Sequence, residues 1–365
     1  MGKYVEKEAL PPPVSTTGPI AWVRQNLVST PANTLMTLFA LYLLWEFVPP
    51  LLNWVFFEAN FAGDGPEACT GAGACWVFVK SRLGFFTYGF YTEAERWRVD
   101  LSFLLLALVV VPQFIKNFPY KAWIGVAGLT VLPVVVGILL LGGMFGLAHV
   151  ETHQWGGLML TLVLSYVGIV AALPFGVILA LGRRSEMPTV RFVCVTFIEL
   201  WRGVPLISVL FMASVMLPLF LPSGWDFEKL LRALIGITMF QSAYMAEVIR
   251  GGLQAIPKGQ FEAAAALGLG YWRSMGLIIL PQALKLVIPG IVNTFIALFK
   301  DTTLVLIIGL LDILATVQSS IVDPKWGGVA TEGYIFAAFC FWVFCYGMSK
   351  YSQSLERKLH TGHKR

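Results

Sequence analysis

The chain has 365 residues, of which 57% are hydrophobic and 13% are charged, and its formal net charge is +5. So apolar a composition is untypical of a soluble globular protein. The positive charge follows from basic loops beside membrane spans and gives no reason to expect a nucleic-acid partner. The composition therefore indicates a protein that crosses a membrane several times.

Eight apolar runs are long enough to cross roughly 30 Å of hydrocarbon as helices. They are too long for barrel strands and lack strict alternation. We therefore expect an all-α membrane protein with about eight transmembrane helices. In chain order the runs are residues 34–57, 99–115 (the shortest, interrupted late by Pro112), 124–147, 156–181, 192–221, 230–250, 286–308 and 333–350.

Basic residues predict the orientation of these spans. Residues 1–33, which include Pro11-Pro12-Pro13 and no signal peptide, form an expected cytoplasmic tail, and residues 351–365 form a second one. The longest loop, 58–98, is expected outside, whereas the polar segment 251–285 is expected inside. The cytoplasmic side is defined by Lys3, Lys7, Arg24, Lys116, Lys121, Arg183, Arg184, Arg191, Arg250, Lys258, Arg273, Lys285, Lys350, Arg357 and Lys358.

The outer loop 58–98 contains Cys69 and Cys75. In the oxidising periplasm of a Gram-negative host these two residues form either a disulfide or two free thiols. Cys194, Cys340 and Cys345 fall in or near spans and are expected to pack as small apolar residues. We predict no metal site, since the nearest candidate, His149 and His153 beside Glu151, is better explained as a solvated turn.

The segment 251–285 separates two spans and has its own local structure. Ile256-Pro257-Lys258-Gly259 is a turn sequence, in which Pro fixes one dihedral and Gly relaxes another. The Ala-rich stretch 260–267 predicts a helix that ends at Gly268 and Gly270. A second helix is expected over 271–280, before Pro281. Glu262 lies in the first helical turn, where a carboxylate stabilises exposed amide dipoles and is placed to meet a basic partner residue.

Polar groups inside spans are costly and suggest function. Candidate substrate-pathway residues are Gln241, Ser242, Tyr244, Asn293, Lys300, Asp301, Thr302 and Thr303. Lys300 and Asp301 point about 100° apart on a helix, and the alternative to substrate contact is an ion pair between helices. Glu199 and Arg202 are three residues apart and are expected to pair as a structural or gating element.

Several motifs in the second half of the chain resemble the polar amino acid permease family of ABC importers. They are Trp201-Arg202-Gly203-Val204-Pro205-Leu206, Ser242-Ala243-Tyr244-Met245-Ala246-Glu247, Glu262-Ala263-Ala264-Ala265-Ala266-Leu267-Gly268, Leu280-Pro281-Gln282-Ala283 and Lys300-Asp301-Thr302-Thr303-Leu304. Val204 replaces the usual Thr, and Thr303 replaces the usual Ser. The resemblance covers about residues 156–350. The three earlier spans resemble the long M-type permease of general L-amino acid transporters.

This resemblance implies a type I importer permease in the bacterial inner membrane. Its five-helix core spans 151–350 with the coupling loop 251–285, and three accessory helices occupy 34–150. It further implies a sister permease, a periplasmic amino-acid-binding protein and a cytoplasmic ATPase dimer. The residues that would contact the ATPase are Glu262, Ala263, Ala264, Leu267, Gly268 and Pro281.

The chain is not expected to be an enzyme or to bind a cofactor. It contains no Gly-x-x-x-x-Gly-Lys-Ser/Thr loop, so ATP and Mg would be bound by the partner ATPase. The alternative is an autonomous secondary transporter or channel driven by an ion gradient, and the Lys300-Asp301 pair favours it. In that case 251–285 would be only a helical hairpin on the membrane surface.

Overall fold

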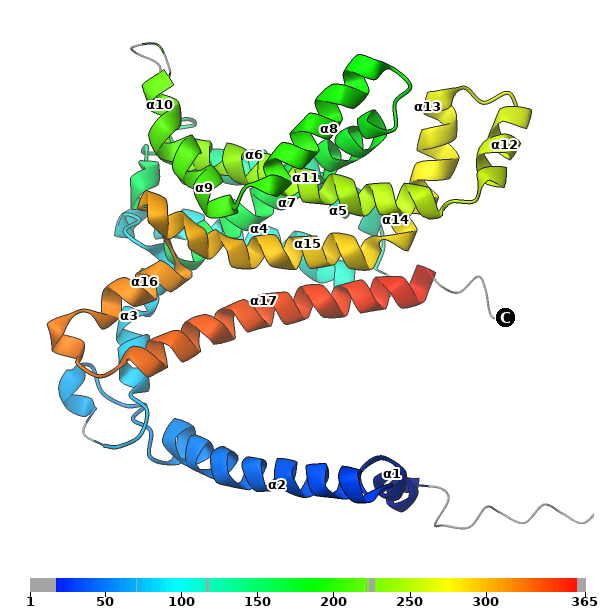
Figure 1. Ribbon diagram of the computed structural model, residues 1–365. Coiled ribbons are helices and arrows are strands. Elements are labelled where there is room, and N and C mark those ends of the chain that lie inside the picture. Colours follow the sequence, from blue (N-terminus) through cyan, green and yellow to red (C-terminus); the bar gives the residue numbers. More distant parts are fainter. Residues whose placement is uncertain (1–17, 70, 116–117, 221, 223–226, 360–365) are drawn as a thin grey trace, which may run out of the picture. The chain divides into compact units, whose positions relative to one another are not determined.

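The computed structural model describes residues 18–69, 71–115, 118–220, 222 and 227–359 (Figure 1). The predicted tail at 1–17 and the chain end at 360–365 lie outside the described residues. The chain divides into two compact units between Val77 and Phe78. The predicted boundary near residue 150 does not separate compact units, because helices on both sides of it share one core.

Almost all of the described chain is helical (Figure 1). In chain order the elements are α1 (Gly18–Asn26), α2 (Pro31–Leu52), α3 (Trp76–Tyr88), α4 (Arg96–Phe114), α5 (Lys121–Thr130), α6 (Leu132–Leu141), α7 (Gly157–Arg183), α8 (Pro188–Gly203), α9 (Leu206–Phe211), α10 (Leu217–Phe220), α11 (Lys229–Ala255), α12 (Lys258–Ala266), α13 (Tyr271–Ser274), α14 (Leu280–Leu286), α15 (Ile288–Asp301), β1 (Leu311–Asp312), α16 (Ile313–Ile321) and α17 (Ala330–Leu359).

The first unit consists mainly of α2 and the loop that follows it. Thr30 caps α2 by accepting a hydrogen bond from the amide of Asn33 at 3.2 Å, which satisfies one of the unpaired donors at a helix start. A disulfide joins Cys69 and Cys75, whose Cα atoms are 5.5 Å apart. The indole Nε1 of Trp76 donates to the carbonyl of Val55 at 2.9 Å. The outer loop is therefore tied to the end of α2 by side chains as well as by the chain itself.

The second unit is organised around α7 and α11, which lie against each other over much of their length. Gly176 permits this approach, because a Cβ there would collide with the side chain of Met245. α15 lies beside α17 (Figure 1). One buried cluster joins the accessory helices to the core and includes Val99 of α4, Leu140 of α6 and Leu164 of α7.

Two predicted spans are broken by proline. α5 and α6 are bent by 44° relative to each other, and α8 and α9–α10 by 104°. Pro133 and Pro205 each lack the amide hydrogen that a continuous helix needs. Pro205 also holds Val204 in an extended conformation, as expected for the residue before a proline. The predicted run 192–221 is therefore two helices with a sharp bend between them, not one continuous helix.

By length and composition, five helices can cross a membrane, or up to seven if each bent pair is one span, among the residues that the structure describes. The predicted sixth run, 230–250, is helical as part of α11. It is less apolar than the others because α11 carries Lys229, Arg232, Glu247 and Arg250. α11 buries many residues against neighbouring helices, and a helix shielded from lipid by protein need not be apolar all round.

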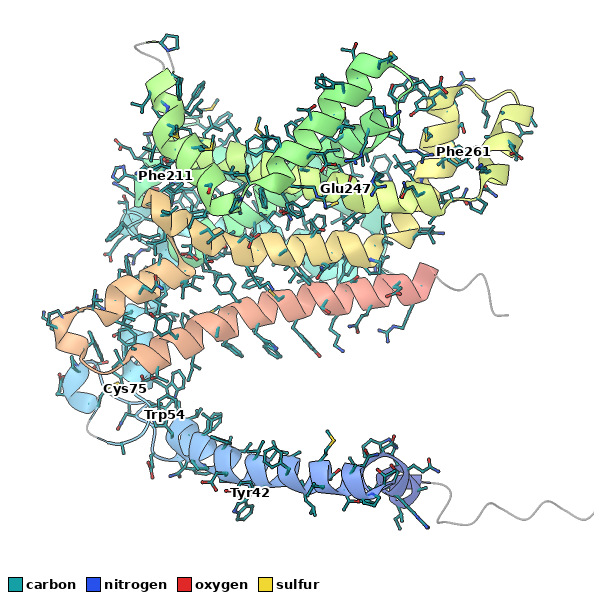
Figure 2. The ribbon with its side chains drawn as sticks, in the orientation of Figure 1. Tyr42, Trp54, Cys75, Phe211, Glu247 and Phe261 are labelled. Carbon is teal, nitrogen blue, oxygen red and sulfur yellow. A yellow bond between two sulfur atoms is a disulfide. The ribbon has the colours of Figure 1, made fainter. Side chains whose placement is uncertain are left out.

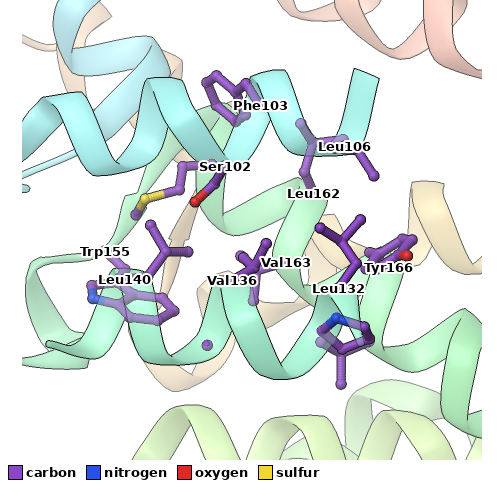
Figure 3. Close-up of a pocket in the computed structure, with 14 residues that line it drawn as sticks. Ser102, Phe103, Leu106, Leu132, Val136, Leu140, Trp155, Leu162, Val163 and Tyr166 are labelled. Atoms are coloured by element: carbon purple, nitrogen blue, oxygen red, sulfur yellow. The ribbon is translucent and has the colours of Figure 1, made fainter. Parts of the chain in front are cut away.

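A small apolar cavity of about 70 Å³ lies between α4, α6 and α7 (Figure 3). Its lining includes Ser102, Val136, Gly137 and Tyr166, and the Tyr166 hydroxyl donates to the carbonyl of Gly128. α6 ends at Leu141, before the predicted end of that span at 147. α4 and α6 therefore pack on α7 with a gap left between the three helices.

Candidate functional site

The predicted helix in the segment 251–285 is confirmed as α12. It begins at Lys258, directly after Pro257 and two residues before its predicted start, and ends at Ala266. Glu262 therefore lies beyond the first helical turn, contrary to the prediction, and is not placed to stabilise the amide dipoles there. Gly268 has φ +72°, a left-handed conformation that suits glycine. The amide of Leu269 donates to the carbonyl of Ala264 at 3.1 Å, and that of Gly268 to Ala265 at 2.9 Å. These two bonds are the Schellman arrangement that ends a helix and satisfies its last carbonyls.

The second helix of this segment continues past its predicted end. It starts at Tyr271, as expected, but runs through Pro281 to Leu286. Between Ser274 and Leu280 the backbone forms a π-helical turn over Met275–Ile279. Pro281 stands in the first turn of α14, where its missing amide hydrogen costs little because the π-turn has already shifted the bonding pattern.

α12 has one face against the core and one face exposed. Ala264 is buried, and Phe261 packs against a buried cluster that includes Leu253 and Ile279 (Figure 2). On the other side Glu262 is exposed, and Leu267 is 75% exposed. An Ala-rich helix that is anchored by one aromatic ring and presents its remaining surface is suited to receive a partner.

Two side-chain contacts hold α12 in place, and a hydrogen bond to α11 fixes the arginine that makes one of them. Arg184, just after α7, donates from Nη1 to the carbonyl of Leu253 at 3.1 Å. Its guanidinium lies 5.6 Å from the centre of the Phe261 ring, within the range of cation–π attraction. On the opposite flank Gln282 of α14 donates to the side chain of Gln260 at 3.0 Å. α12 is thus connected to the ends of α7, α11 and α14.

A charged cluster lies where α7, α8 and α11 meet. We call Arg183, Glu199, Arg202, Glu247 and Arg250 the arginine–glutamate cluster. Its central carboxylate is labelled in Figure 2. Glu247 pairs with Arg250 at 2.9 Å, Arg183 at 3.0 Å and Arg202 at 3.6 Å. Three helices therefore share one carboxylate.

Glu199 and Arg202 do not pair with each other as expected. Glu199 pairs with Arg183 of α7 at 2.9 Å. Arg202 pairs with Glu247 and lies 5.7 Å from the centre of the Tyr244 ring. Both residues form ion pairs between helices. The prediction that they form ion pairs is therefore confirmed, but the predicted partners are wrong.

The predicted pathway residues have different environments. Gln241 is buried and donates to the carbonyl of Thr294 at 2.6 Å, which joins α11 to α15. Ser242 and Thr302 are buried and donate to carbonyls of their own helical segments. Tyr244, Asn293 and Lys300 are exposed, Asp301 is half-buried, and Thr303 donates to the carbonyl of Lys300.

The histidines and cysteines considered in the sequence lie outside this site. His153 pairs with Glu151 at 2.9 Å. In the described part of the chain no group of three or more His, Cys, Asp and Glu side chains could hold a metal ion. Cys194 is buried, and Cys340 and Cys345 are partly buried free thiols.

The sequence patterns do not reveal the roles of three residues of the site. Phe261 is a single aromatic residue in an Ala-rich helix, and one residue gives no periodicity from which its burial could be predicted. Arg183 and Arg184 were interpreted only as orientation signals. Both arginines stand directly at the end of a long apolar helix, and the next two helices each carry an acidic residue near them. This arrangement of charges indicates an ion-pair cluster.

A family model described as "Binding-protein-dependent transport system inner membrane component" matches residues 172–360. This match covers more than half of the chain, and the chain belongs to that family. It is thus a multi-pass membrane protein of the permease class, and the family resemblance predicted from the motifs is confirmed.

Two relatives are similar over nearly their whole length. The chain is 57% identical over 343 residues to the inner membrane amino-acid ABC transporter permease protein YhdY of Escherichia coli, and the alignment covers 94% of each chain. It is 40% identical over 433 residues to the glutamate/glutamine/aspartate/asparagine transport system permease protein BztC of Rhodobacter capsulatus, covering 99% of each. A crystal structure of an amino acid ABC transporter with histidines matches 55% of this chain and 92% of that one, with 32% identity and a TM-score of 0.49.

Proposed function

We propose that this chain is the permease subunit of an ATP-driven amino acid importer and that α12 is its coupling helix. The observation that carries the proposal is the two-sided packing of α12, which is anchored through Phe261 and Arg184 and exposes Glu262 and Leu267. Family membership and the names of the two relatives supply the transport class and the amino acid substrates.

In this proposal both termini are cytoplasmic, and an ATPase dimer that binds ATP and Mg contacts α12. A sister permease completes the pathway, and a periplasmic binding protein delivers the amino acid. Binding of ATP would draw the ATPase subunits together and move α12, and the spans would then alternate between outward and inward access. Candidate pathway residues lie on the permease helices of the second half of the chain. Tyr244, Asn293 and Lys300 have exposed side chains. The other candidates are Gln241, Ser242, Asp301, Thr302 and Thr303.

Substitution of Gly268 tests the coupling role. A Cβ at this position meets nothing within 4 Å, so a new side chain does not disturb the fold by collision. We expect Gly268→Asp to reach the membrane at the normal level and to abolish uptake, because a charged side chain then projects from the end of α12 into the partner. Gly268→Asn is the matched control, since Asn has the same shape, carries no charge and tolerates φ > 0.

The measurement is uptake of a mixture of radiolabelled L-amino acids by cells that express each variant at equal membrane level. We expect Gly268→Asn to retain more uptake than Gly268→Asp. Normal uptake by the Asp variant would refute the coupling role. Mass spectrometry of the chain purified gently from its native membrane tests the partners, and recovery of the folded chain without an ATPase would contradict the proposal.

A further inference from the structure

Arg183 and Arg184 are consecutive residues whose side chains reach two different parts of the site. Arg183 is the last residue of α7, and Arg184 is the first residue beyond it, with φ −94° and ψ 0°. Side chains of neighbouring residues at a helix end diverge by about 100°. One guanidinium therefore reaches the arginine–glutamate cluster, and the other reaches α12.

Arg184 forms the contact with the coupling helix. The carbonyl of Leu253 that accepts its hydrogen bond is among the last four of α11, which lack partners within the helix. The face of its guanidinium meets Phe261, the ring that anchors α12. Arg184 thus joins the end of α7, the end of α11 and α12 in one contact.

Arg183 forms the contact with the cluster. It pairs with Glu247 of α11 and Glu199 of α8. Through Glu247 it is linked to Arg202 at the end of α8, directly before the 104° bend into α9. The ion pairs of Arg183 with Glu199 and Glu247 therefore help to hold α8 against α11.

We propose that the Arg183-Arg184 dipeptide links the coupling helix to the arginine–glutamate cluster. Displacement of α12 moves Phe261 and Arg184, Arg184 moves the end of α7, and Arg183 then exchanges its contacts with Glu199 and Glu247. The cluster thereby releases or locks α8 against α11. This inference rests on the proposed function of α12 and assigns Arg183 and Arg184 as positioning residues for its motion.

The test uses the complete transporter, with its ATPase, sister permease and binding protein, reconstituted in liposomes. The readout is the amount of amino acid imported per ATP hydrolysed, measured with a mixture of radiolabelled L-amino acids. We expect Arg184→Ala to lower this ratio about five- to tenfold, the size of a typical coupling between sites. Arg184→Lys keeps a cation over the ring and a donor to the Leu253 carbonyl, and it should restore part of the ratio.

Two controls make the result specific. Arg191 is an exposed arginine in the first turn of α8 whose side chain makes no hydrogen bond, ion pair or ring contact with the described residues. Its backbone amide donates to the Met187 carbonyl at 3.0 Å, a bond that alanine keeps, so Arg191→Ala should leave the ratio unchanged. If Arg184 acts through Phe261, the double variant Arg184→Ala with Phe261→Ala should be no worse than Phe261→Ala alone. Should Arg184→Ala reduce assembly, Arg184→Gln takes its place under the same criteria.

The outcomes separate this inference from the proposed function. Normal uptake by Gly268→Asp overturns the coupling role of α12 and the linkage with it. An inactive Gly268→Asp together with an Arg184→Ala ratio equal to that of Arg191→Ala overturns the linkage alone. Losses that multiply in the double variant also overturn it, because they show that Arg184 and Phe261 act separately.

Discussion

The stability of the core at α7, α8 and α11 should depend strongly on Glu247. Its carboxylate accepts three contacts from Arg250 at 2.9–3.1 Å and pairs with Arg183 at 3.0 Å. The side chain is only 16% exposed, so little water is available to replace it. Removing one member of a buried ionic group costs about 3–5 kcal/mol because the remaining charges lose their partner. Allowing for partial exposure of the arginines, we expect Glu247→Gln to cost about 3 kcal/mol.

The assay is thermal melting of the protein purified in detergent with the subunits that accompany it. At about 2–4 °C per kcal/mol for a unit of this size, the melting temperature should fall by roughly 6–12 °C. Glu199→Gln is the matched control, since Glu199 forms an ion pair with Arg183 and its side chain is 54% exposed. Surface pairs contribute little, so its melting temperature should change by less than roughly 3 °C. Equal shifts in the two variants would refute the argument from burial.

Two further predictions concern α6 with its C-terminal end and the start of α16. Gly142 has φ +66°, and a Cβ there would collide with the Ala148 carbonyl, whereas a Cβ at Gly137 meets open space in the cavity of Figure 3. In thermal melts Gly142→Ala should destabilise the protein by about 1–3 kcal/mol, and Gly137→Ala should stabilise it by about 0.5–1 kcal/mol; a stabilising Gly142→Ala would contradict the reasoning. Asp312, between the spans Ile288–Ile308 and Ala330–Lys358, caps α16, and burial raises its pKa to about 6. The unfolded chain then loses this proton first, so stability should fall as pH rises from about 4 to about 6 and stay level above; Asp312→Asn should remove that part of the pH dependence, and identical melting profiles would rule the titration out.

The elements that were predictable from sequence are those determined by local chemistry. The end of α12 is an example, because the Ala-rich run and Gly268 together specify a helix and its left-handed cap. The length of the apolar runs likewise predicted the positions of the spans, but it does not indicate where a helix axis bends. The bends at Pro133 and Pro205 were missed for that reason, since a hydropathy run continues unchanged through a residue that breaks the hydrogen-bond pattern.

The predicted Glu199–Arg202 pair shows why the contacts of the site were less predictable. A spacing of three residues indicates which side chains can meet on one helix. It does not indicate which partner another helix supplies. Glu247 is the less exposed carboxylate, and its two oxygens provide about four acceptor positions, enough for three guanidinium groups. Arg202 therefore gains more at Glu247 than at the exposed Glu199, which is left to Arg183. That choice depends on how α7, α8 and α11 cross, and the crossing is set by packing between helices at positions such as Gly176 against Met245.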